Sequence, residues 1–387
     1  MKQRKTMMAL VAISAWVFIS CQKNAGDHAI YEDAAGKPAG STAAREKTEV
    51  GYVYTLSNET GNNRVLTYSR SVAGTLHFEK AYATGGTGTG GGLGNQGAVT
   101  LTENHDFLLA VNAGSHSVSS FAVHKNGLEL ISTVSSAGLM PVSVTIHENL
   151  VYVLNAGGTG NIAGFWMHAD GSLHPIAGSS RPLSSAAAGA AQISFVQDGK
   201  VVVITEKATN KIISYTIGLD GIAGMMHAVH SSNPTPFGFA AGSNGMIYVS
   251  EAVGGAPGAS TVSAYHVSTS GTISLVDGPE SAGQTAACWV VLTNNEKYVY
   301  ATNTGSNNLS SFSTSKNGNL DVLSAIAANT MINVPIDAAL TNNSKYLYVL
   351  NAGDESITSM FIDKDGGLSY IQNVQGLPDG ATGLAAK

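Results

Sequence analysis

A pattern that recurs seven times from residue 51 to the C-terminus is the feature that most constrains how this chain folds. Each copy has a β-branched and aromatic segment ending in Asn or Glu, a polar loop, a second apolar segment, a tight turn and a third segment. The polar residues that end the first segments are Asn58, Asn112, Asn155, Glu206, Glu251, Asn303 and Asn351. Their mean spacing of about 49 residues is in the range of the blades of a propeller.

A glycine marks the tight turn in every repeat. The seven glycines are Gly74, Gly127, Gly171, Gly221, Gly271, Gly318 and Gly366, and five of them follow Asn or Asp. Asn-Gly and Asp-Gly suit the positive φ angles of two-residue hairpin turns between neighbouring antiparallel strands. Each repeat is therefore predicted to end in β-hairpins.

A fourth apolar segment precedes six of the seven repeats, and the first repeat, which begins at residue 51, lacks it. The missing segment is found at the C-terminus, in residues 380–385. If that last strand completes the first blade, the sheet ring closes without an open edge. The 45 glycines and the low charged fraction of 12% also disfavour a helical bundle. The sequence thus predicts an all-β, seven-bladed β-propeller of four-stranded antiparallel blades over residues 51–387, closed by the C-terminal strand.

The first twenty residues are predicted to be a signal peptide. A cationic start is followed by a mostly apolar run over residues 6–20, which is too short to span a membrane comfortably. The run ends at Ser20-Cys21, which resembles a bacterial lipoprotein box and implies lipidation of Cys21. Residues 21–50 are polar and lack apolar periodicity, so they are expected to form a flexible tether. We expect an exported lipoprotein of the bacterial cell envelope, in the periplasm or on the outer membrane, that meets the membrane through its lipid only. The alternative is an ordinary signal peptide followed by an incidental cysteine.

The repeats resemble the lactonase family of seven-bladed propellers, which includes 6-phosphogluconolactonase-like and carboxymuconate-cyclase-like enzymes. The resemblance is carried by residues 151–155 with Ile162 and Phe165, by residues 348–351 with Ile357 and Phe361, and by the Asp-Gly-x-Leu turns at Gly171 and Gly366. It covers the whole repeat region. It implies a lactone hydrolase, which is a carboxylic ester hydrolase, or a related cycloisomerase, acting on a lactone of a sugar acid.

Two carboxylates interrupt the series of strand-end asparagines. In a propeller of this strand order, the loops from second to third strands and the connections between blades surround one end of the channel, which we call the mouth face. Glu206 and Glu251 hold equivalent places in neighbouring repeats and are predicted to be the catalytic residues, with one of them activating water as a base. Alternatively, Glu206 pairs with Lys207 or Lys211 and Glu251 caps the loop that follows it. The resemblance favours Glu251, because family members often carry Tyr-Val-x-Glu at this position.

Five further residues are predicted to bind the substrate. Arg181 and Lys207 are the cations expected near the mouth face, where they would hold an anionic substrate or an oxyanion. His230 falls in a mouth-side loop, and Asn155 and Asn303 belong to the strand-end amides. For the two cations, a surface ion pair is the alternative. No histidine pair has close metal-ligand spacing together with a carboxylate, so neither a metal nor a cofactor is expected.

Residues 84–94 are rich in glycine and contain a formal Gly-x-Gly-x-x-Gly at Gly86, Gly88 and Gly91. The segment leads into another strand and not into a helix, so a dinucleotide site is excluded. It is expected to connect the first two blades near the mouth. There it either folds over a ligand or fills the channel with backbone.

Two function classes therefore remain open. In the resembling family, the strand before the Tyr-Val-x-Glu segment usually starts with Pro-Arg-His, whereas residues 234–238 of this chain read Pro-Thr-Pro-Phe-Gly. The absent cation and imidazole favour a non-catalytic propeller that binds a glycan or a protein, and the resemblance favours a lactonase. With a net charge of −6 and no basic patch, nucleic acid is not an expected partner. We expect a monomer.

Overall fold

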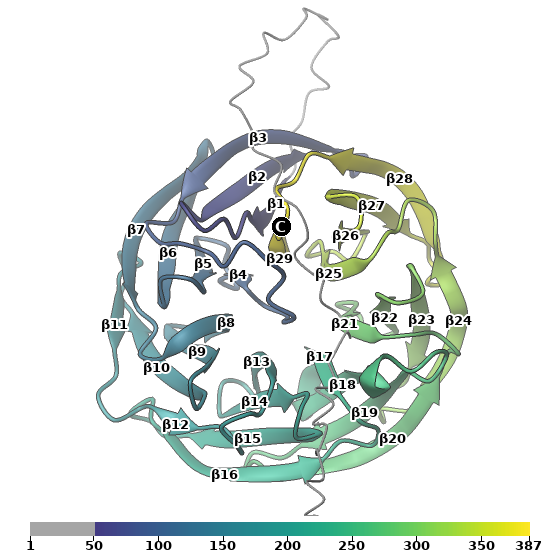
Figure 1. The fold of residues 1–387 in the computed structure, drawn as a ribbon. Helices are drawn as coiled ribbons and strands as arrows, with labels where there is room; N and C mark the ends of the chain where they lie inside the picture. Colours follow the sequence, from purple (N-terminus) through teal and green to yellow (C-terminus); the bar gives the residue numbers. More distant parts are fainter. Residues whose placement is uncertain (1–50) are drawn as a thin grey trace, which may run out of the picture.

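The computed structural model describes residues 51–387, which form seven antiparallel sheets arranged as blades around a central channel (Figure 1). Six blades have four strands, and in the third blade two short strands, β11 (Leu173–Pro175) and β12 (Arg181–Pro182), both pair with the third strand and share the outer position. The predicted all-β, seven-bladed propeller is confirmed. The signal peptide, the tether and the lipidation of Cys21 lie outside the described residues.

From the inner to the outer strand, the first three blades are as follows. Blade 1 has β29 (Thr382–Ala386), β1 (Gly51–Leu56), β2 (Arg64–Arg70) and β3 (Leu76–Ala83); blade 2 has β4 (Val99–Leu101), β5 (Phe107–Asn112), β6 (Ser117–His124) and β7 (Gly127–Ser135); blade 3 has β8 (Leu139–His147), β9 (Leu150–Gly157), β10 (Asn161–Met167), β11 (Leu173–Pro175) and β12 (Arg181–Pro182).

The remaining four blades follow the same order. Blade 4 has β13 (Ala190–Val196), β14 (Val201–Glu206), β15 (Lys211–Ile217) and β16 (Ala223–His230); blade 5 has β17 (Pro236–Ala241), β18 (Met246–Glu251), β19 (Thr261–Val267) and β20 (Ile273–Ser281); blade 6 has β21 (Ala287–Leu292), β22 (Tyr298–Asn303), β23 (Asn308–Thr314) and β24 (Leu320–Ala328); blade 7 has β25 (Pro335–Leu340), β26 (Tyr346–Asn351), β27 (Ser356–Ile362) and β28 (Leu368–Gln375). Two short 3-10 turns, Ser243–Gly245 and Val253–Gly255, flank β18. Within residues 51–387, no helix is long and apolar enough to cross a membrane.

The C-terminal strand closes the ring as predicted. β29 pairs with β1 so that Val53 lies opposite Ala386 and Thr55 opposite Leu384. Past the strand, the Lys387 backbone N–H donates to the Tyr52 carbonyl at 2.9 Å. The first and last segments of the chain therefore share one blade, and their pairing holds the ring together.

The repeated turn differs from the expected two-residue hairpin in six blades. All seven turn glycines have a positive φ, but only blade 2 has a two-residue connection, with His124 paired to Gly127. In the other six blades a residue N–H bonds the carbonyl four positions later, as His168 does with Ser172 at 2.9 Å, so the loop has three residues. A three-residue loop places its glycine in the left-handed conformation after a type I turn, which the dipeptide alone does not distinguish from a two-residue turn.

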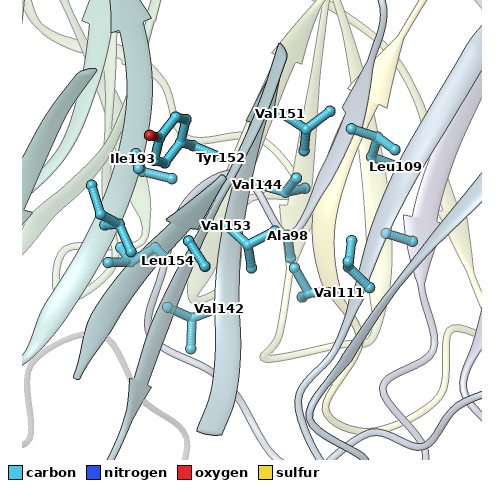
Figure 2. Close-up of a cluster of buried hydrophobic side chains, with 14 of the residues drawn as sticks. Ala98, Leu109, Val111, Val142, Val144, Val151, Tyr152, Val153, Leu154 and Ile193 are labelled. Atoms are coloured by element: carbon cyan, nitrogen blue, oxygen red, sulfur yellow. The ribbon is translucent and has the colours of Figure 1, made fainter. Parts of the chain in front are cut away.

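The blades are joined by apolar packing and by repeated tyrosine hydrogen bonds. Figure 2 shows Val151 and Val153 of blade 3 in one buried cluster with Leu109 and Val111 of blade 2. Tyrosine hydroxyls on the second strands then donate to turn carbonyls of the next blade. These bonds are Tyr152 to Gly221 at 2.7 Å, Tyr300 to Gly366 at 2.9 Å and Tyr348 to Gly74 at 3.1 Å. In three of the seven junctions, a recurring Tyr and the turn glycine of the next blade therefore fix neighbouring blades together.

Candidate functional site at the mouth face

Three of the strand-end asparagines share one structural role. Each is buried, and its Nδ2 donates to a hydroxyl seven residues later, at the start of the third strand. These bonds are Asn112 to Ser119 at 2.7 Å, Asn303 to Ser310 at 2.8 Å and Asn351 to Thr358 at 2.9 Å. The amide thus ties the end of the second strand to the beginning of the third. Asn303, predicted to bind substrate, is occupied in this way.

Asn155 is the second amide predicted to bind substrate. Its Nδ2 donates to the Ser136 carbonyl at 3.0 Å, and its Oδ1 has no hydrogen-bond partner. None of the residue is exposed, so it is not at a surface that a ligand reaches directly.

Glu251 ends β18 in a cage of four hydroxyl groups. Its Oε2 accepts hydrogen bonds from Thr261 Oγ1 at 2.7 Å and Ser263 Oγ at 3.0 Å. Its Oε1 accepts from Ser231 Oγ at 3.0 Å and from the Tyr265 hydroxyl at 3.2 Å. Thr261 and Ser263 open the third strand, like the hydroxyl partners of the asparagines, but a longer loop separates them from the strand end. The carboxylate accepts where the asparagine amides donate.

The pKa of the Glu251 carboxyl follows from the burial of this residue. The residue has no exposed surface, and burial raises the pKa of its carboxyl to about 7, against the opposing effect of the four hydroxyl bonds. A carboxyl with a pKa near neutral is suited to act as a general base. Of its four partners, only Ser231 is not fully buried. Ser231 is therefore the group that connects the carboxyl to the surface.

Glu206 is also buried, at the end of β14. Its Oε1 accepts from the Ser184 backbone N–H at 2.8 Å, and its Oε2 accepts from the Ser184 hydroxyl and from Thr209 Oγ1, the latter at 2.6 Å. Within residues 51–387 it forms no ion pair with Lys207 or Lys211. Glu206 thus caps the connection between blades 3 and 4.

Lys207 turns toward the channel. Its Nζ lies 4.7 Å from the centre of the Phe237 ring and donates to the carbonyl of Gly94. The Phe237 ring in turn packs against Trp289, with ring centres 4.8 Å apart. Burial lowers the pKa of the Lys207 amine to about 8, because no carboxylate of the described chain compensates its charge.

The glycine-rich connection between β3 and β4 fills the mouth end of the channel, one of the two outcomes expected from its sequence. It belongs to blades 1 and 2, but Gln96 bonds the Ala191 carbonyl of blade 4 at 3.1 Å and the Val290 carbonyl of blade 6 at 2.8 Å. The Trp289 indole N–H donates to the Asn95 carbonyl at 2.7 Å. Figure 1 shows this connection entering the ring from β4. We call residues 84–97 the plug; beside it remains a cavity of about 30 Å³, room for one or two water molecules.

The structure separates the other predicted binding residues. Arg181 lies in β12, at the outer part of blade 3, where its guanidinium donates to the carbonyls of Gly178 and Ser180, each at 2.8 Å. Within residues 51–387, no ion pair joins it to Glu206 or Glu251. His230 ends β16, is exposed, pairs across the sheet with Lys211 and directly precedes Ser231.

The structure thus brings Ser231 to Glu251, and His230 directly precedes Ser231 at the end of β16. Ser231 and Tyr265 were not singled out by the sequence. The hydroxyl pattern of the other repeats would have identified Thr261 and Ser263. Ser231 has counterparts in Thr84 and Ser136, which also directly follow an outer strand and donate a backbone N–H to the preceding loop. Among residues 51–387, no group of three or more His, Cys, Asp or Glu side chains is placed to hold a metal ion.

Comparison with known proteins supports the architecture. Residues 259–381 match the sequence profile of the family described as "Lactonase, 7-bladed beta-propeller". No curated protein matches the sequence.

Solved structures resemble the whole propeller. A candidate 6-phosphogluconolactonase from Bacteroides fragilis is 19% identical with a TM-score of 0.69, over 88% of this chain and 99% of that one. The periplasmic gluconolactonase of Pseudomonas aeruginosa is 15% identical with a TM-score of 0.65, over 85% of this chain and 98% of that one. At these identities the likeness establishes the fold. The chain is thus a seven-bladed propeller. Its sequence similarity to the lactonase family lies in residues 259–381, C-terminal to both Glu206 and Glu251.

Proposed function

We propose that this protein is a lactonase-like propeller of the cell envelope, exported as a lipoprotein, that hydrolyses a lactone of a sugar acid at its mouth face. The observation that carries the proposal is the Glu251 carboxyl, whose pKa is about 7 and whose Oε1 is bonded to the partly exposed Ser231. The substrate class is taken from the lactonase profile and from the names of the two lactonases with the same fold.

Hydrolysis of a lactone needs a base to remove a proton from the attacking oxygen and a group to stabilise the oxyanion. Above a pH of about 7, most of the Glu251 carboxyl is ionised and can accept a proton that passes through the Ser231 hydroxyl. His230, at the end of β16, directly precedes Ser231 and pairs across the sheet with Lys211, at the start of β15. They are suited to the acidic end of a sugar-acid substrate.

A second function, the non-catalytic binding of a glycan or a protein, is favoured by a different observation. Glu206 and Glu251 have no exposed surface, and the plug occupies the channel between Lys207 and Trp289. A propeller closed in this way would present its outer loops, and not a pocket, to a partner.

The two functions are separated by an assay of the purified protein on a panel of sugar-acid lactones. For the hydrolase, Glu251→Gln should lower kcat/KM by about 10² to 10⁴, the usual contribution of a general base. Glu206→Gln, which removes the equivalent charge in the neighbouring blade, tests whether the other predicted carboxylate contributes. Turnover that survives in both single variants and in the double variant excludes this site, and no turnover on any lactone supports the binding function.

A further inference from the structure

Ser231 is held at the start of the connection from blade 4 to blade 5. It follows His230, the last residue of β16, and its backbone N–H donates to the Asn210 carbonyl at 2.9 Å. This bond fixes the backbone against the loop between β14 and β15. The residue is partly exposed, whereas Thr261, Ser263 and Tyr265 are all buried. Its hydroxyl therefore lies at the boundary between the buried carboxyl and the mouth face.

The two carboxylate oxygens of Glu251 have different hydrogen-bond partners. Oε2 is bonded by Thr261 and Ser263, both on β19 of the same blade, which fix the carboxyl plane. Oε1 is bonded by Ser231, which reaches it from the preceding connection at 3.0 Å, and by the Tyr265 hydroxyl at 3.2 Å. The serine is thus the one hydroxyl that comes to the carboxyl from outside its own sheet.

Tyr265 orients this pair. Its hydroxyl lies 3.4 Å from Ser231 Oγ and accepts a hydrogen bond from the Ser232 backbone N–H at 2.6 Å. Burial raises the pKa of the Tyr265 hydroxyl to about 12, so it stays protonated and donates to Glu251 at neutral pH. A nucleophile within hydrogen-bond reach of a base, with the base oriented by a third group, is the arrangement of covalent hydrolases.

We propose that Ser231 is a covalent nucleophile that accepts the acyl group of a lactone or ester, with Glu251 as its base and Tyr265 as a positioning residue. The substrate class rests on the proposed function, whereas the nucleophile is argued from the contacts of Ser231 alone.

The proposed reaction has two stages, acylation of Ser231 and hydrolysis of the acyl-serine ester. Ser231 Oγ forms a bond to the carbonyl carbon while its proton moves to Glu251. The ring C–O bond then breaks, and the proton passes from Glu251 to the leaving alkoxide, which leaves an acyl-serine ester carrying the new hydroxyl group. Water attacks this ester with Glu251 again taking the proton, and the hydroxy acid leaves as Ser231 Oγ is reprotonated.

The contact between Glu206 and Ser184 differs from the contact between Glu251 and Ser231. Ser184 donates both its backbone N–H and its hydroxyl to the carboxylate, which is the geometry of a loop cap. Ser231 donates only its hydroxyl, and its backbone N–H is bonded elsewhere. The proposal therefore assigns reactivity to Ser231 and not to Ser184.

A fluorophosphonate probe, which phosphonylates activated serines, tests the proposal without a known substrate. The full-length protein is incubated with the probe near pH 8, and the modified residue is located by mass spectrometry. We expect modification at Ser231, its loss in Ser231→Ala, and a rate lowered about 100-fold or more in Glu251→Gln. Ser232→Ala, which removes the neighbouring hydroxyl but keeps the backbone N–H to Tyr265, should be modified like the wild type.

Two further measurements separate a loss of reactivity from a loss of the fold and test the role of Tyr265. Melting curves establish that each variant is folded, and Tyr265→Phe should slow the modification while leaving Ser231 as its site. No modification of Ser231, or an equal rate in Glu251→Gln, overturns the proposal. Lactone turnover that persists in Ser231→Ala also overturns it but leaves the proposed function standing. Modification of Ser231 in a protein that hydrolyses no lactone supports the nucleophile and removes the substrate class.

Discussion

Replacing Glu251 by glutamine is predicted to stabilise the fold above neutral pH. The carboxyl has a pKa of about 7 in the folded protein, against an ordinary value of 4.5. Because the folded-state pKa is raised, the stability that protonation contributes is fully present below pH 4.5 and is lost as the pH rises through 7. At 1.36 kcal/mol per pH unit, the ionised form costs roughly 3 kcal/mol of folding free energy.

Glutamine has the same shape and carries no charge, and amides already bond the equivalent hydroxyls in three other blades. The assay is urea denaturation of both proteins at several values between about pH 4 and pH 8. The free energy of unfolding of the wild type should fall across this range relative to Glu251→Gln, with most of the difference between pH 4.5 and 7. Glu206→Gln controls for the general effect of removing one negative charge. If wild type and Glu251→Gln keep a constant difference at every pH, the argument from burial is wrong.

Three other perturbations test separate parts of the account. Deleting residues 379–387 removes β29 and should lower the melting temperature of the whole propeller, since ladder bonds worth about 1 kcal/mol each and roughly 2 kcal/mol for Leu384 are lost; an unchanged melting temperature contradicts closure by this strand. Cys21→Ala should move the protein from the membrane fraction to a soluble exported fraction, and a wild type that is already soluble after export refutes the lipid anchor. Trp289→Phe keeps an aromatic ring but removes the bond to the Asn95 carbonyl, so limited proteolysis should cut the plug faster than in the wild type, whereas equal rates would mean that this bond does not hold the plug.

Most of the fold could be predicted because every blade carries its own local signals. Strand-end amides, turn glycines and apolar segments recur at one spacing, and the absence of a fourth strand before residue 51 predicted the role of the C-terminus. The turn type was missed because a glycine with positive φ serves both two-residue and three-residue loops. The channel-filling role of the plug was one of two expected outcomes, since a glycine-rich segment has few side chains that specify its contacts.

The candidate site was harder to predict because its groups come from separate connections. The sequence singled out Glu251 as an exception in a repeat, but its burial depends on Ser231, twenty positions earlier, and on Thr261, ten positions later. Thr84 and Ser136 hold the position of Ser231 in blades 1 and 2, but neither of those blades ends its second strand in a carboxylate, so the repeat alone does not pair Ser231 with Glu251. Arg181 was expected near the mouth face because it lies in the connection between blades 3 and 4; the structure places it in β12, opposite Ile162 near the start of β10, with its guanidinium bonded to carbonyls of that connection. Local periodicity specifies blades, whereas the contacts between their connections require the assembled ring.

The most direct test of the account is the pH dependence of lactone hydrolysis by the purified protein, with wild type and Glu251→Gln measured side by side as acid release from a sugar-acid lactone. A base with a pKa of about 7 predicts that kcat/KM of the wild type rises with pH and levels off above 7, because only the ionised carboxyl accepts a proton. Glu251→Gln should be about 100-fold slower or more, without this rise. Turnover that is equal in the two proteins, or that shows the same pH profile in both, would contradict the claim that Glu251 is the base of this propeller.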